Sequence, residues 1–238
     1  MDQEAILTTI TLIVGLAGIF WQINAKRQDD IYLAHLSRID RQISELYGPL
    51  YALFESGDRQ WRAFLDEFST HRNSEKYLGF FPGEDDDNND FPMPSKDHLR
   101  IYRLWNESVF FPINIKMEDI MINNAELIVG DTIPDAFLQF STHMAGMKAK
   151  VAEWQKDYFD SENWKLHVFP FAHPERSLDF YVTAAFSVIK RKQSELLSGK
   201  INKINESEIA SEISKEERRL HENYNIINQR DYGVGHDK

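Results

Sequence analysis

The stretch that organises this chain is residues 5–23, AILTTITLIVGLAGIFWQI. It holds no charged residue and only a few polar ones. As a helix rising about 1.5 Å per residue it would be roughly 28 Å long, close to the hydrocarbon thickness of a bilayer. A helix also satisfies its own backbone hydrogen bonds, as a segment in lipid must. We therefore expect a transmembrane helix within an anchor of residues 1–25.

Three alternatives compete for this stretch: a secretory signal peptide, a buried core helix and a helix lying on a membrane surface. A signal peptide needs a basic N-terminal region and small residues at its cleavage site. Here residues 1–4 are MDQE, and Ile23 precedes the candidate cleavage site after Ala25 by two residues. A surface-lying helix needs a polar face rich in Lys and Arg, which is missing. The length and position of the apolar run argue against a core helix.

The flanks of the stretch predict its orientation. Lys26 and Arg27 follow it directly, Arg38 and Arg41 come later, and nothing basic precedes it. The positive-inside rule then places the C-terminal side in the cytoplasm, with Trp21 near the inner interface. We expect a single-pass membrane protein with a cytoplasmic C-terminal domain.

Small and polar residues recur along the stretch at three- and four-residue spacing, so they share one helix face: Thr8, Thr11, Gly15, Gly18 and Gln22. Such a face lets transmembrane helices pack closely and hydrogen-bond across the pair. We expect a homo-oligomer formed through it. The alternative is that Gly and Thr occur here only because they are common in membrane spans.

Composition limits the chemistry. The chain has no cysteine among its 238 residues, which excludes disulfides, zinc–thiolate sites, iron–sulfur clusters and a cysteine nucleophile. A net charge of −11 disfavours nucleic acid as a partner and electrostatic adhesion to anionic lipid. No cofactor is expected.

Beyond the anchor the hydrophobic periodicity is helical, and it predicts an all-α cytoplasmic bundle of about five helices over residues 26–198. The first helix carries a heptad stripe of Tyr32, Leu36, Ile39, Ile43, Leu46, Leu50 and Leu53. The stripe fits either a coiled coil that continues the anchor or the core face of a bundle helix, and we favour the bundle. Gly48-Pro49 should kink or break this helix.

Two further segments look irregular. Residues 84–90, EDDDNND, predict an acidic loop, and their partial match to a calcium-binding EF-hand loop fails at Asp90 and Lys96. Residues 199–238 read as a polar, partly disordered tail with a marginal helix. Four isoleucines in it should bury little: Ile201, Ile204, Ile209 and Ile213.

No sequence motif identifies a catalytic or metal site. The eight histidines form neither His-x-x-x-His nor His-Glu-x-x-His, and there is no Gly-x-Ser-x-Gly, P-loop or Gly-x-Gly-x-x-Gly. Carboxylates near the aromatic helices, at Glu118, Asp119, Glu126 and Asp131, fit a solvated face better than acid–base chemistry. Catalytic residues therefore stay unassigned.

A pocket between aromatic helices is the best candidate for a ligand site. His143 lies near Met144 and Met147 in the predicted core, where its imidazole could have a shifted pKa. Methionines suit an adaptable apolar surface, and Trp105 belongs to the neighbouring aromatic helix. Ordinary core packing around a buried, hydrogen-bonded histidine is the interpretation that we favour over a pocket.

The chain resembles a group of uncharacterised bacterial single-pass helical membrane proteins, which implies a place in the bacterial inner membrane. The resemblance rests on the N-terminal span, the Arg-rich helix after it, LYGPLYAL at residues 46–53, Trp61, Trp105 followed by Phe111-Pro112, and residues 128–154. The resemblance covers residues 5–197. It implies an architecture and no activity, and it brings no catalytic or binding residues.

We therefore expect a membrane-tethered, non-enzymatic interaction or scaffold protein that self-associates, with a possible protein partner. A role in bacterial stress response or anti-phage defence is a hypothesis from architecture alone. The main alternative is a membrane-anchored sensor of a small ligand, or a hydrolase, using the pocket. A third is an oligomeric pore lined by Thr8, Thr11 and Gln22.

Overall fold

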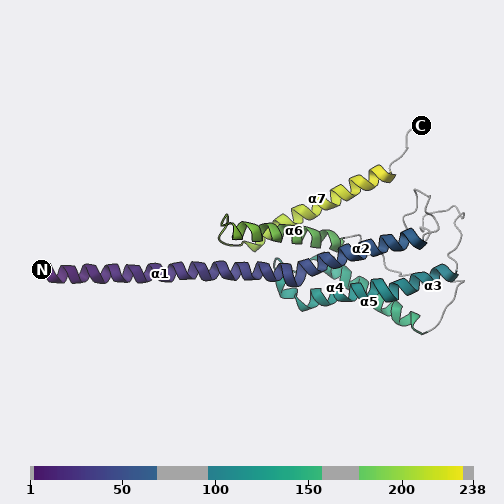
Figure 1. Ribbon diagram of the computed structural model, residues 1–238, viewed down its shortest axis with the longest axis horizontal. Helices are drawn as coiled ribbons and strands as arrows, with labels where there is room; N and C mark the ends of the chain where they lie inside the picture. Colours follow the sequence, from purple (N-terminus) through teal and green to yellow (C-terminus); the bar gives the residue numbers. More distant parts are fainter. Residues whose placement is uncertain (1–2, 69–95, 157–176, 233–238) are drawn as a thin grey trace.

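The computed structural model describes residues 3–68, 96–156 and 177–232, apart from the side chains of residues 3–10, 98 and 225–232. Regular structure in these ranges is helical, which confirms the all-α bundle (Figure 1). The long helices are α1 (Gln3–Arg41), α2 (Gly48–Phe68), α3 (Lys96–Trp105), α4 (Phe111–Asn123), α5 (Asp135–Trp154), α6 (Ser177–Leu197) and α7 (Glu206–Tyr232). The predicted acidic loop lies outside the described residues.

The expected break at Gly48-Pro49 does not occur. Instead α1 continues into α2 through a π-helical segment, η1 (Gln42–Tyr47), in which the Gly48 N–H donates to the Ile43 carbonyl. Proline lacks an N–H and its ring clashes with the carbonyl four residues earlier, so a turn widened by one residue lets the helix continue past it.

The second proline inside a helix is accommodated in the same way. Segment η2 (Asn106–Phe110) is also π-helical and joins α3 to α4, with the Phe111 N–H bonded to the Asn106 carbonyl. Pro112 lies two residues beyond η2, just as Pro49 lies two residues beyond η1. The Phe111-Pro112 step is therefore continuous helix as well.

The main core lies where α6 packs against α1, η1, α2, α5 and α7, and where α4 packs against α2 and α5. Ile39, Leu46 and Leu50 of the heptad stripe are buried in this core, and Tyr32 and Leu53 pack against it. The stripe is thus the core face of a bundle helix rather than a coiled coil.

The segment expected as a polar tail contributes to the same core. Helix α7 packs along α6, and Ile209 and Ile213 are only 2% and 1% exposed. The prediction that they bury little is wrong, because their four-residue spacing puts both on the face that meets α6. Lys192 of α6 also pairs with Glu208 and Glu212 of α7, at 2.9 and 2.7 Å.

The N-terminal part of α1 projects away from the bundle (Figure 1). Every side chain from Thr11 to Ile31 is exposed. Contact with the core begins at Tyr32, whose hydroxyl donates to the Leu196 carbonyl at 3.2 Å. Over the described residues, we find no helix with enough length and apolar character to cross a membrane.

Candidate functional site

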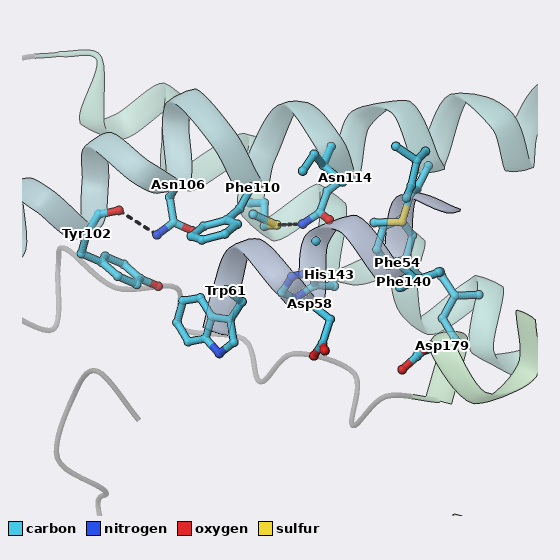
Figure 2. Close-up of a pocket in the computed structure, with 16 residues that line it drawn as sticks. Phe54, Asp58, Trp61, Tyr102, Asn106, Phe110, Asn114, Phe140, His143 and Asp179 are labelled. Atoms are coloured by element: carbon cyan, nitrogen blue, oxygen red, sulfur yellow. Dashed lines mark hydrogen bonds between the residues drawn. The ribbon is translucent and has the colours of Figure 1, made fainter. Parts of the chain in front are cut away.

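The bundle holds a cavity of about 410 Å³ between α2, η2, α4, α5 and the first turn of α6 (Figure 2). Most of its lining is aliphatic, aromatic or methionine side chain. Pockets of 300–1,000 Å³ with apolar walls and a few polar groups are typical of small-molecule sites.

One wall of the cavity is shared with a second, aromatic core cluster. Trp61 of α2 and Phe110 of η2 meet edge to face, with ring centroids 5.4 Å apart. Phe64 lies behind them, and Tyr102 of α3 completes the wall. Aromatic pairs in this geometry are favourable beyond their buried area, so this wall is a well-packed aromatic side of the cavity.

The carboxylates, amides and imidazole of the cavity come from five helical segments, α2, η2, α4, α5 and α6. His143 of α5, only 6% exposed, and Asp58 of α2 both line it. Asp179 of α6 also lines the cavity (Figure 2). These carboxylates and the imidazole already take part in interactions within the chain.

Two asparagine side chains, from η2 and α4, also line the cavity, and Figure 2 shows them across it from Asp58 and His143. The buried Asn106 donates its amide N–H to the Tyr102 carbonyl at 2.8 Å. Asn114 of α4 donates its amide N–H to the Met147 sulfur at 3.3 Å. A thioether is a weak acceptor, so this second bond is one that a ligand oxygen can replace.

The four residues predicted to form a pocket occupy different places. His143 and Met147 line the cavity. Met144 is fully buried in the main core, and Trp105 packs against Phe64 in the aromatic cluster. The α2 wall was not anticipated: Asp58 and Trp61 share a helix face by their spacing, but nothing in the sequence shows that this face meets α5.

The carboxylates considered for acid–base chemistry do not come together. Glu118 pairs with Lys148 at 2.5 Å, while Asp119 and Asp131 are exposed. Hydrogen bonds from its own backbone N–H and from Arg41 hold the pKa of Glu126 below its usual value. Within the part of the chain that the structure describes, no group of three or more His, Asp or Glu side chains could hold a metal ion.

The residues predicted to mediate self-association lie on the projecting part of α1. Thr11, Gly15, Gly18 and Gln22 are exposed, and a Cβ added at either glycine would meet no atom within 4 Å. The Thr8 side chain lies outside the described residues. The arrangement within one chain therefore leaves this face open to a second helix.

Comparison of the chain with known protein families, with curated proteins and with solved structures finds no match.

Proposed function

We propose that this protein is a membrane-tethered, non-enzymatic interaction protein of the bacterial inner membrane. The apolar part of α1 inserts into the bilayer, and the helical bundle lies on the cytoplasmic side. One observation carries the proposal: on this projecting helix the large apolar side chains are 56–76% exposed, at Leu12, Ile13, Val14, Leu16, Ile19, Phe20, Trp21 and Ile23. The stretch expected to insert, residues 5–23, begins before Thr11, the first residue whose side chain is described.

The distribution of these side chains favours lipid over a protein groove. A groove covers one face of a helix, whereas here every side chain from Thr11 to Ile23 is exposed, around the whole helix. Burying a large apolar side chain gains about 1.5–3 kcal/mol, so removing these eight from water is worth on the order of 10 kcal/mol. Lipid is the environment that can cover them all at once.

The charges that orient the helix are those nearest the apolar stretch. Arg38 forms an ion pair with Glu206, and Arg41 pairs with Glu45 and Glu126. These two arginines therefore belong to the bundle. Lys26 and Arg27 are exposed on the projecting helix, and they support a cytoplasmic C-terminal side.

Self-association through the small-residue face is part of the proposal. Two copies in one membrane meet at a high effective concentration, so a modest helix contact is enough to pair them. Paired bundles would then present a two-fold surface to a protein partner.

Flotation of the full-length protein with phosphatidylethanolamine–phosphatidylglycerol vesicles tests the tether. Wild type should float, and the double variant Leu16→Lys/Ile19→Lys should not, because each lysine at the centre of a span costs about 2.5–3.5 kcal/mol. The matched control is Leu33→Lys/Leu197→Lys, which places two lysines at exposed leucines outside the stretch. If both double variants float like wild type, the tether is wrong.

Crosslinking in the same vesicles tests the pairing face. Gly15→Leu should weaken the crosslinked dimer, whereas Ala17→Leu on another face of the helix should not. If the two substitutions weaken the dimer equally, the two copies do not pair through the small-residue face.

A further inference from the structure

The cavity in the bundle is kept open by a glycine that the backbone does not require. Gly57 lies inside α2, where glycine costs about 1 kcal/mol relative to alanine. A Cβ built there would meet its nearest atom, the Ile113 Cγ2, only at 4.0 Å. Gly48 in the same helix is different, since a Cβ there would lie 2.3 Å from a carbonyl oxygen. The close carbonyl oxygen explains why residue 48 is a glycine. No such clash exists at residue 57, where the missing side chain leaves space in the cavity.

The shape and polarity of this space select a class of ligand. One side of it is aromatic, through Trp61, Tyr102 and Phe110, and the side that includes Met117 and Met147 is adaptable. A flat apolar body fits between such walls.

The hydrogen-bonding groups favour a neutral ligand over a charged one. Asp58 and Asp179 are already engaged within the chain, so neither is kept for a ligand cation. Asn114 can gain a stronger bond from a ligand oxygen, because its amide N–H now donates to the Met147 sulfur, which is a weak acceptor. An amide can both donate and accept, and it recognises another neutral amide or carbonyl.

We infer that the cavity between α2, α4 and α5 binds a small neutral molecule with a flat apolar ring system and one carboxamide-like or carbonyl group held by Asn114. This site is independent of the membrane tether. It makes the bundle a receptor for a small ligand.

Calorimetric titration of the full-length protein in mild detergent tests the inference with four probes that share one ring system. They are naphthalene, naphthalene-1-carboxamide, naphthalene-1-carboxylate and 1-naphthylmethylamine. The carboxamide should bind most tightly. Asn114→Leu should weaken it about 2- to 12-fold, which is the effect of one hydrogen bond, and should leave naphthalene unchanged.

Gly57→Leu is the variant that fills the cavity. Leucine is a good helix former, so the variant should keep its far-ultraviolet circular dichroism and melt no lower than wild type while losing all four probes. Partition of a probe into detergent is the same for both proteins and cancels in the comparison. If Gly57→Leu binds the carboxamide as wild type does, the site is wrong. If the amine or the carboxylate binds most tightly, the ligand class is wrong.

Discussion

The same substitution at two glycines of α2 should change stability in opposite directions. At Gly48 a Cβ would lie 2.3 Å from the Ile43 carbonyl oxygen, where 3.0 Å is the practical limit, so the backbone of η1 must shift by about 0.7 Å. Overpacking of this kind costs about 1–3 kcal/mol, and weakening the Gly48 N–H bond to Ile43 adds about 0.5–1.5. Better helix propensity returns only about 1 kcal/mol. We expect Gly48→Ala to lower the free energy of unfolding by about 1–3 kcal/mol.

Gly57→Ala is the matched control, because its Cβ would meet its nearest atom at 4.0 Å, an ordinary contact distance, and only the propensity gain of about 0.5–1 kcal/mol remains. Urea unfolding of the full chain in mild detergent, followed by circular dichroism, measures both. The free energies of unfolding of the two variants should differ by at least about 1.5 kcal/mol. If Gly48→Ala is as stable as Gly57→Ala, the account of the π-helical segment is refuted.

The ionic contacts of α7 give further predictions. Lys192→Met removes the ammonium group that Glu208 and Glu212 contact and should lower the free energy of unfolding by about 1–3 kcal/mol, whereas Lys200→Met at an exposed site should not; urea unfolding checks this. Burial acts to raise the pKa of Glu212, but hydrogen bonds from Lys192 and Arg191 hold it below its usual value. The stabilisation that this lowered pKa gives the folded state is present above the usual pKa of glutamate and is lost as pH falls through the lowered pKa. Acid titrations of stability should therefore be flatter in Lys192→Met than in wild type. Burial raises the pKa of Glu217, so the folded state becomes more stable as pH falls from neutral towards the usual pKa of glutamate. Glu217→Gln should therefore be more stable than wild type at neutral pH, and its stability should lack this pH dependence.

Hydrophobic periodicity predicts the helical parts of this fold well. The stripe through Ile39, Leu46 and Leu50 does face the core. Periodicity succeeds because it reports which face of a helix is apolar, and a bundle buries that face whatever its neighbours are.

Periodicity fails where the outcome depends on another segment. A proline reads as a helix break, but one widened turn before Pro49 keeps the helix continuous, and only the packed structure shows it. Ile209 and Ile213 look too sparse to bury, yet α6 supplies the surface that covers them. The cavity is harder still to foresee, because a space beside Gly57 leaves no pattern in the sequence.

Because the backbone of α1 is unbroken, the mainly polar residues 24–31 act as a torsional spacer between the proposed membrane stretch and the bundle. Each residue of a helix adds about 1.5 Å and 100° of rotation, so the nine steps from Ile23 to Tyr32 set both a height of roughly 14 Å and an azimuth. Inserting one residue would turn the small-residue face by about 100° relative to the bundle while lifting it hardly at all. Seven inserted residues would almost restore the angle and add about 10 Å. The number of residues in the spacer, rather than their chemistry, thus determines which surfaces two paired bundles turn towards each other.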